Sequence, residues 1–388
     1  MLKYRVNPVT CDDYRRLAER RLPRFLFDYI DGAAGQEISM SRNVEEFRRI
    51  CLEQRVLRDV GDIDTGVEMM GVRGAMPIVL GPVALAGMYR RRGEAQAARA
   101  AESAGVPFTA ATMGICTVEE VQAACGENAW FQLYMLRDRG IVEGILRRVR
   151  DARVPVLVFT VDLPMLGKRY RDDHNGMMAD GLRGAAAKML QLVSRPRWLY
   201  DVGLRGKPHD FGSLRGVIRG VHDLQGFKDF IDSQFDPTVT WDDIRWLRER
   251  WAGQLLIKGV MCAGDAREAV ACGADGVVVS NHGGRQLDGV ASSISRLPEV
   301  VEAVGNDAEV YVDSGIRCGA DAVKAVALGA RGVMIGRSWA FPLAARGEQG
   351  VADTLSVMRR EIANSMALMG VRRISELNPS LVDTRGVC

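Results

Sequence analysis

The sequence predicts an α/β protein folded as a (β/α)8 TIM barrel, with an N-terminal helical extension and a long insertion after the fourth strand. From residue 77 onward, eight short apolar runs alternate with helical stretches. Continuous apolar strands are expected in a parallel sheet that helices cover on both faces. No G-x-G-x-x-G follows any of the runs and there is no Walker A loop, which disfavours a doubly wound nucleotide-binding sheet.

The predicted strands are short and rich in β-branched residues. In chain order they are Pro77–Leu85, Val106–Thr112, Trp130–Met135, Val156–Asp162, Leu255–Val260, Gly276–His282, Glu309–Ser314 and Gly332–Arg337.

The segments between these runs carry helix signals. Thr117-Val-Glu-Glu120 and Thr240-Trp-Asp-Asp243 have the pattern of a capping box, which starts a helix. The helical stretches Gly93–Ala104, Asp265–Cys272 and Ala320–Leu328 are each followed by glycine, the residue that most often ends a helix. The alternation of strand and helix therefore continues around the predicted barrel.

We expect residues 1–388 to form a single domain, because no linker and no second core is recognisable. Residues 1–76 are predicted as a helical extension that includes a helical segment over Cys11–Ile30, and residues 77–340 as the barrel. An insertion of about 168–239 interrupts the barrel between its fourth and fifth strands, and residues 341–388 form C-terminal helices and a tail. So long a connection inside a compact domain is usually functional or mobile.

The composition excludes several classes of protein. The 388 residues carry 52 basic and 49 acidic side chains, a net charge of +3, which gives no case for nucleic-acid binding. The eight cysteines form no C-x-x-C and no metal-ligand spacing, so we expect reduced thiols, no metal and a cytoplasmic location. The N-terminus lacks the apolar core of a secretory signal, and no apolar stretch approaches the roughly 18 residues of a membrane span.

Polar residues gather where the predicted strands end, and barrel enzymes build their active sites at that end of the strands. His282, in Ser-Asn-His-Gly-Gly-Arg-Gln-Leu-Asp at 280–288, is followed by Arg285. A base beside a guanidinium suits proton removal from an α-hydroxy acid, although a glycine-rich surface loop is the alternative. Asp162 could cap a helix or could orient His282 from across the barrel. Arg169 could be a second carboxylate contact or part of a solvated loop.

Two further features indicate a cofactor or a phosphate group. Lys258 lies in the apolar strand Leu-Leu-Ile-Lys-Gly-Val, where it could form a Schiff base, bind phosphate or stabilise an anion on a cofactor. The glycine-containing turns after the last two strands hold Asp313, Gly315, Arg317, Gly336 and Arg337. Phosphate often binds at this place in barrels.

These motifs resemble those of the FMN-dependent 2-hydroxy acid oxidases and dehydrogenases over about residues 10–380. Ser280–Asp288 is specific for that family, and Phe-Gln-Leu-Tyr134, Thr-Val-Asp162, Ile-Lys-Gly259 and Asp-Ser-Gly-Ile-Arg317 follow in the family's order. Within the family, the likeness is greatest to the bacterial membrane-associated L-lactate dehydrogenases.

The resemblance implies FMN as cofactor and assigns a role to each matching residue. His282 would be the base, oriented by Asp162, with Tyr134 also catalytic. The substrate would contact Tyr29, Tyr134, Arg169 and Arg285. FMN would contact Pro82, Val83, Ala84, Thr112, Gln132, Thr160, Lys258, Ser280, Asp313, Gly315, Arg317, Gly336 and Arg337.

The resemblance leaves the electron acceptor and the substrate side chain open. L-lactate or a similar small (S)-2-hydroxy acid with quinone as acceptor is one possibility, and an oxygen-using oxidase, including one for mandelate-type substrates, is another. A barrel isomerase or aldolase that binds phosphate is the alternative of another class. Met113, Met165, Leu166 and Tyr170 are candidates for the substrate pocket, and the family is commonly tetrameric.

The insertion carries a second signal. Residues 176–220 hold eight basic and three acidic side chains together with apolar and aromatic ones. This composition suits an anionic membrane surface, such as the cytoplasmic face of the inner membrane. A solvated lid over the active site is the alternative.

Overall fold

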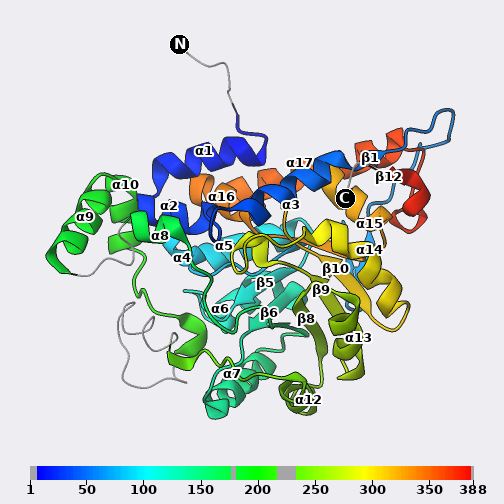
Figure 1. Cartoon of the computed structure of the whole chain (residues 1–388). Helices are drawn as coiled ribbons and strands as arrows, with labels where there is room; N and C mark the ends of the chain where they lie inside the picture. The colour runs from blue at the N-terminus through cyan, green and yellow to red at the C-terminus, as the bar shows by residue number, and fades with distance from the viewer. Residues whose placement is uncertain (1–6, 176–180, 216–232, 386–388) are drawn as a thin grey trace.

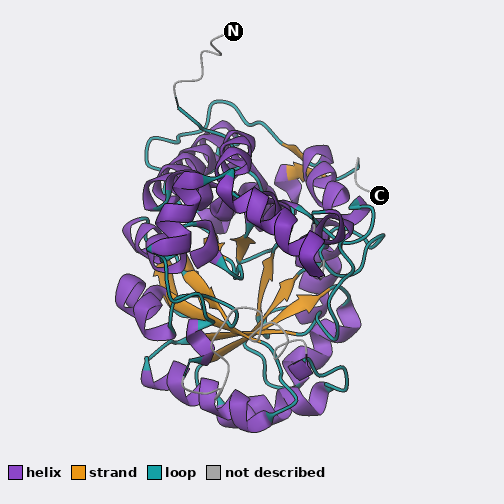
Figure 2. Ribbon diagram, turned by 90° about the vertical axis from the view of Figure 1, so that its left-hand side faces the viewer, coloured by secondary structure: helices purple, strands orange, loops and turns teal. Residues whose placement is uncertain are grey.

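The computed structural model describes residues 7–175, 181–215 and 233–385. At its centre is a closed barrel of parallel strands in the order β10-β11-β4-β5-β6-β7-β8-β9, enclosed by helices (Figure 2). Each strand overlaps one of the eight apolar runs, so the predicted barrel is confirmed. The barrel strands are β4 (Ile78–Leu80), β5 (Phe108–Ala111), β6 (Ala129–Leu133), β7 (Val156–Thr160), β8 (Gln254–Val260), β9 (Gly276–Val279), β10 (Glu309–Val312) and β11 (Gly332–Ile335).

The strands form the core because nearly all of their side chains are buried. Every residue of β6 and β7 is buried, as expected for strands with helices outside and packed side chains inside. The register brings functional residues together, since Thr160 at the end of β7 pairs with Lys258 in β8.

The helices that follow the strands begin and end largely where the sequence predicts. Thr117 and Thr240 each form the expected capping box, and Gly273 and Gly329 have positive φ just beyond their helices. The helices are α4 (Ala86–Tyr89), α5 (Gly93–Ser103), α6 (Val118–Cys125), α7 (Arg139–Asp151), α12 (Trp241–Arg250), α13 (Ala263–Ala271), α14 (Ser293–Val304), α15 (Gly319–Ala327), α16 (Arg337–Arg346) and α17 (Glu348–Leu368).

The N-terminal extension differs from the prediction in two ways. The expected helix over Cys11–Ile30 is two helices, α1 (Cys11–Arg21) and α2 (Arg24–Asp31). Leu22 is extended because the proline that follows disfavours helical geometry. A third helix, α3 (Ile38–Arg49), follows.

The extension is also not wholly helical. The strands β2 (Val67–Met69) and β3 (Val72–Gly74) form an antiparallel pair. The strand β1 (Cys51–Leu52) pairs with β12 (Val382–Asp383) near the C-terminus. These two-stranded pairs are too short to leave a periodic signal in the sequence.

The insertion lies between β7 and β8 and contains several helices. It contains α8 (Tyr170–His174), α9 (Gly181–Val193) and α10 (Pro196–Trp198), which Figure 1 shows in green beside α2. The Trp198 indole donates to the carbonyl of Met88 at 2.7 Å. This bond anchors the insertion to the barrel. No helix among the described residues is long and apolar enough to cross a membrane.

Candidate active site at the carboxyl end of the barrel

A cavity lies at the carboxyl ends of the strands, and most of the predicted site residues line it. The predicted residues on its wall are Tyr29, Pro82, Val83, Ala84, Gln132, Tyr134, Thr160, Arg169, Lys258, His282, Arg285, Asp313, Gly315, Arg317, Gly336 and Arg337. Asp162, Thr112 and Ser280 are not on the wall, and each of them contacts a residue that is.

His282 and Asp162 are brought together from the ends of β9 and β7. The Nδ1 atom of His282 lies 2.8 Å from Oδ1 of Asp162, and its backbone N–H donates to Ser280 Oγ at 3.0 Å. His282 has a φ of 57°, a left-handed conformation that is uncommon outside glycine and is often held at functional sites. The other ring nitrogen, Nε2, is therefore available as a proton acceptor when Asp162 receives the Nδ1 proton.

Burial and charge set the protonation of this pair. Burial lowers the pKa of His282 below its usual value, while the Asp162 carboxylate partly opposes that shift. Burial alone would raise the pKa of Asp162, but the charge and hydrogen bond of His282 and the charge of Lys258 lower it. Near neutral pH the pair is thus a neutral imidazole beside a carboxylate, which is the state that a general base needs.

Two arginines from different loops reach the same cavity. Arg285 Nη1 donates to the carbonyl oxygens of Tyr29 at 2.6 Å and Gly32 at 2.9 Å. Its guanidinium carbon lies 4.9 Å from the centre of the Tyr29 ring, and that of Arg169 lies 5.5 Å from it. Burial, and next the charge of Arg169, lower the pKa of Arg285. Two buried cations around one aromatic ring form a site for an anionic group.

Tyr134, at the end of β6, is a neutral phenol in this cavity. Burial and the charge of Asp162 raise its pKa, so its hydroxyl is a hydrogen-bond donor at neutral pH. Its ring packs edge-on against Phe235, with 5.9 Å between the ring centres.

Lys258 is a buried ammonium group in β8. Its Nζ lies 2.9 Å from Ser280 Oγ and 3.0 Å from Asp313 Oδ2. Burial works against its charge, but Asp313 and Asp162 raise its pKa above the usual value. The lysine is therefore positively charged, with a carboxylate to compensate it, and lies on the cavity wall.

The turns after β10 and β11 form the side of the cavity predicted to bind phosphate. Gly315 has a φ of 103°, and a Cβ there would run into the backbone of Asn43. Arg317 lines the cavity. Arg337 has most of its donors engaged, since it donates to the carbonyls of Ile30, Gly32 and Gly283, and burial lowers its pKa strongly.

The ends of β4 to β7 supply the opposite wall. Gln132 accepts the Thr112 N–H at 3.3 Å through Oε1, and the Thr112 hydroxyl donates to the Gln132 carbonyl at 2.6 Å. Thr112 thus supports Gln132 from behind the wall. Gln132 Nε2 and Thr160 Oγ1 are buried without a partner among the described residues, which indicates that a polar molecule completes them.

Several wall residues escaped the sequence analysis. Tyr89 donates to the carbonyl of Ala84 at 2.8 Å, and Ser314 accepts the N–H of Gly283 at 2.8 Å. Leu163 and Phe235 also line the cavity. Ser314 follows Asp313 directly and could have been suspected, but nothing in the sequence indicates that Phe235, from the far end of the insertion, reaches this place.

The cavity thus combines a buried histidine–carboxylate pair with two guanidinium groups, an ammonium group and two unpartnered polar atoms. This combination suits a barrel enzyme that acts on an anionic substrate beside a bound cofactor. The comparisons with known proteins agree. Residues 18–384 match the family described as FMN-dependent dehydrogenase, and the chain belongs to that family.

Relatives and solved structures support this assignment. The chain is 50% identical to an L-lactate dehydrogenase of Caulobacter vibrioides over 373 residues, 96% of this chain and 97% of the relative. It is 49% identical to an L-lactate dehydrogenase of Azorhizobium caulinodans over 366 residues, 94% and 96% of the two chains. A crystal structure of a monotopic membrane protein, (S)-mandelate dehydrogenase, has a TM-score of 0.91 at 35% identity, covering 98% of this chain and 100% of that one. That of a mandelate oxidase has a TM-score of 0.82 at 35% identity, covering 97% and 98%.

The residues of the cavity fit FMN. The unpartnered Gln132 Nε2 and Thr160 Oγ1 suit the polar edge of a flavin ring, and the buried Lys258 ammonium suits a group that becomes anionic on reduction. The backbone at Gly315 and the guanidinium of Arg317 suit the phosphate. FMN is therefore the cofactor of this enzyme.

Proposed function

We propose that the protein oxidises L-lactate, or a similar small (S)-2-hydroxy acid, to the 2-oxo acid. The observation that carries the proposal is the His282–Asp162 hydrogen bond of 2.8 Å in a cavity that also holds Arg169 and Arg285. Relatives at 49–50% identity are named L-lactate dehydrogenases, which favours lactate over larger hydroxy acids.

The substrate loses two electrons and two protons as its C–OH group becomes C=O. Bound FMN would take up both electrons and one of the two protons. His282 Nε2 accepts one proton from the substrate, from the hydroxyl if hydride leaves the carbon or from the carbon if the proton leaves first. Asp162 holds the ring through Nδ1 and stabilises the imidazolium that forms.

The substrate carboxylate binds between Arg169 and Arg285, and the phenol of Tyr134 donates to the substrate. Charge-assisted bonds of this kind are strong in a buried site. The substrate side chain would face Met113, Leu163, Leu166 and Phe235, which share the cavity wall.

Met165 and Tyr170 are poor candidates for that pocket. Both side chains are exposed, and neither lies on the cavity wall.

Anaerobic reduction of the flavin by a panel of hydroxy acids tests the proposal. We expect L-lactate to bleach the flavin absorbance of the purified holoenzyme faster than D-lactate or (S)-mandelate does. Rapid bleaching by L-lactate in a His282→Ala variant would contradict the assigned base. Preference for (S)-mandelate would replace the substrate and leave the base standing.

For the acceptor we propose quinone. The test compares aerobic turnover with and without a soluble quinone, measuring hydrogen peroxide. Peroxide formed in proportion to the oxidised lactate would identify an oxidase instead.

The alternative function, an aldolase with a Schiff-base lysine or an isomerase, needs a neutral Lys258 as nucleophile. The charged state of that lysine and its ion pair with a carboxylate disfavour this alternative.

We further propose that residues 176–220 contact the cytoplasmic face of the inner membrane. Met189, Leu190 and Val193 on α9 are 60%, 70% and 53% exposed. The similar (S)-mandelate dehydrogenase is described as a monotopic membrane protein. Residues 176–180 and 216–220 of this segment, with Met177, Met178 and Arg219, lie outside the described residues.

Vesicle sedimentation tests the membrane contact. A variant with serine at Met189, Leu190 and Val193 should lose binding to vesicles that contain anionic lipid. The matched control places serine at Val56, Leu57 and Leu368, three exposed apolar residues outside the insertion. Equal binding of both variants would contradict the proposal.

We also retain the prediction of a single-domain chain that assembles as a tetramer. Sedimentation velocity of the detergent-solubilised holoenzyme tests the tetramer, and a dimer or monomer would contradict it.

A further inference from the structure

We infer that Asp31 is a positioning residue for substrate binding, acting through Arg171 to place Arg169. The inference rests on the proposed function in assigning the substrate carboxylate to Arg169. Asp31 does not line the cavity, and its effect would pass through α2 and α8.

Arg169 has little that holds its own side chain in place. Its nearest carboxylate is Asp172, at 3.9 Å, although both side chains are largely buried. Its Nε atom is buried without a hydrogen-bond partner among the described residues. Arg285 differs, because two carbonyl oxygens fix its guanidinium. The position of Arg169 therefore depends on the backbone that carries it.

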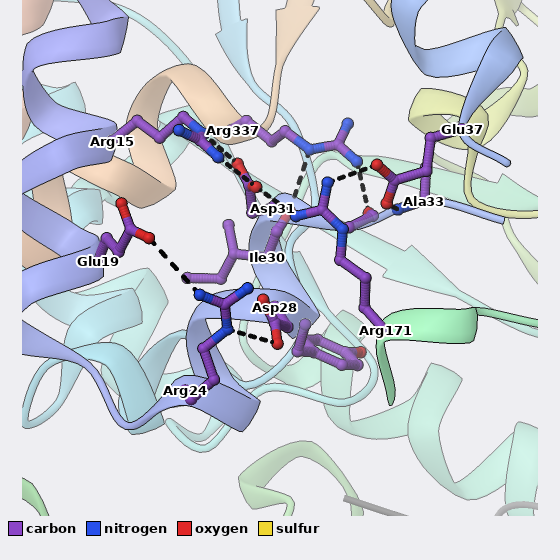
Figure 3. A network of polar contacts seen from close by, with 12 residues as sticks. Arg15, Glu19, Arg24, Asp28, Ile30, Asp31, Ala33, Glu37, Arg171 and Arg337 are labelled. Carbon is purple, nitrogen blue, oxygen red and sulfur yellow. Dashed lines mark hydrogen bonds and ion pairs between the residues drawn. The ribbon is translucent and has the colours of Figure 1, made fainter. Parts of the chain in front are cut away.

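That backbone is held on both sides of Arg169. Before it, the carbonyl of Lys168 accepts the N–H of Gly35 at 2.9 Å, and after it Arg171 makes two ion pairs. Arg169 is the residue that precedes α8, and Arg171 lies in the first turn of that short helix. Arg171 Nη1 lies 2.6 Å from Asp31 Oδ2, and its Nη2 pairs with Glu37. Figure 3 shows Arg171 reaching from α8 to both carboxylates. The two ion pairs thus fasten the start of the insertion to the N-terminal extension.

Asp31 also lies in the same helix as Tyr29, whose ring contacts both arginines of the predicted carboxylate site. It is the last residue of α2, the helix that carries Tyr29. The guanidiniums of Arg169 and Arg285 lie 5.5 Å and 4.9 Å from the centre of the Tyr29 ring. The Asp31 carboxylate therefore connects the helix that carries Tyr29 with the helix that follows Arg169.

Asp31 is built to stay ionised in this place. It is 5% exposed, and burial would raise its pKa, but Arg15 and Arg171 lower it below the usual value. The Arg15 pair is bidentate, with Nε–Oδ1 at 2.5 Å and Nη2–Oδ2 at 2.7 Å. Asp31 thus makes two ion pairs, one with Arg15 of α1 and one with Arg171 of α8. Only the second connects it to the segment that carries Arg169.

Because the two ion pairs can be removed separately, the inference can be tested directly on the holoenzyme. Arg171→Met removes the ion pairs of α8 with Asp31 and Glu37 but leaves Asp31 paired with Arg15, which continues to support the fold. Arg15→Met removes the ion pair between Asp31 and α1 and serves as the matched control. Asp31→Asn weakens both ion pairs of Asp31. The surface control is Asp12→Asn, which removes an exposed carboxylate of α1.

We expect Arg171→Met and Asp31→Asn to raise the KM for L-lactate and the Kd for oxalate, a dicarboxylate probe, by about tenfold to 10²-fold. kcat should change less than threefold or so, because the carboxylate is held equally in the ground and transition states. Arg15→Met and Asp12→Asn should leave both constants within about twofold. FMN content should be the same in all four variants.

A purely structural role would give equal loss of thermal stability for Arg15→Met and Arg171→Met with no separate change in KM or oxalate affinity, and that result would overturn the inference. Arg169→Met separates this failure from failure of the proposed function. If Arg169→Met raises KM and Arg171→Met does not, the positioning role is wrong. If Arg169→Met itself has no effect, the assignment of the carboxylate to Arg169 is wrong. In the Arg169→Met background, Arg171→Met should add no further increase.

Discussion

The loop after β9 and the insertion after β7 each bring one arginine to the cavity, but they hold it in different ways. In residues 280–288 nearly every polar side chain has a nearby partner, and Arg285 donates to two carbonyl oxygens. Asn281 pairs with Asn43 through two hydrogen bonds of 2.8 Å, and Asp288 accepts the N–H groups of Gln36 and Ser39.

The guanidinium of Arg169 makes no comparable hydrogen bonds among the described residues, and its Nε has no partner. Its backbone is held instead, by the bond between Lys168 and Gly35 and by the ion pairs of Arg171 with the N-terminal extension. Both regions are thus held by the N-terminal extension. In the loop after β9 the arginine itself makes the contacts, whereas in the insertion a neighbouring arginine makes them.

The largest effect is expected at the histidine of the compact loop. His282→Gln should lower the rate of flavin reduction by L-lactate by about 10²–10⁴-fold, because it removes the proton acceptor. Stopped-flow absorbance measures this rate. FMN content serves as the control, and a rate within about threefold of wild type would contradict the role of His282.

The next largest effect links the two regions through Asp162. Asp162→Asn should lower kcat by about 10²-fold or more, since the ring loses its orientation and the imidazolium its countercharge. The carboxylate raises the pKa of His282 against burial, so its removal lowers that pKa further. The acid limb of kcat/KM, already expected below the usual histidine pKa of about 6.5, should therefore move to lower pH. A shift to higher pH would contradict this account.

Substitutions at Arg285 and Arg169 should differ in their effect on the free energy of unfolding. Arg285→Lys removes the bonds to Tyr29 and Gly32 and should lower the free energy of unfolding by about 1–3 kcal/mol. The Tyr29 carbonyl loses the arginine donor, and the Gly32 carbonyl keeps only its bond from Arg337. Arg169→Lys should raise the KM for L-lactate comparably but leave the unfolding free energy within about 0.5 kcal/mol. Denaturant unfolding of the holoenzyme measures both. Equal destabilisation by the two substitutions would remove the contrast between the loops.

The smallest effect is expected where the two regions touch. Gln286 donates to the carbonyls of Asp162 at 3.1 Å and Met165 at 2.9 Å, joining the loop after β9 to the start of the insertion. Gln286→Ala should lower the unfolding free energy by about 1 kcal/mol. Leu287→Ala, at a neighbouring side chain that is 70% exposed, is the matched control. The contact would be unimportant if both variants unfolded at the same denaturant concentration.

Much of this protein follows from its sequence, because the signals are local. Apolar runs of β-branched residues predicted the strands, and capping boxes and glycines predicted the helix ends, since both depend on a few neighbouring residues. The Ser280–Asp288 motif identified His282 and Arg285 in the same way. The resemblance to a known family then pointed to FMN and to most of the residues that line the cavity.

Only the tertiary structure decided how the site is held together. It engaged Arg337 with backbone carbonyls and placed Thr112 and Ser280 behind the cavity wall. It also joined Asp31 to Arg171 across 140 positions of the chain. Contacts between residues so far apart depend on how the helices pack around the barrel, and packing of this kind leaves no periodic or local pattern in the sequence.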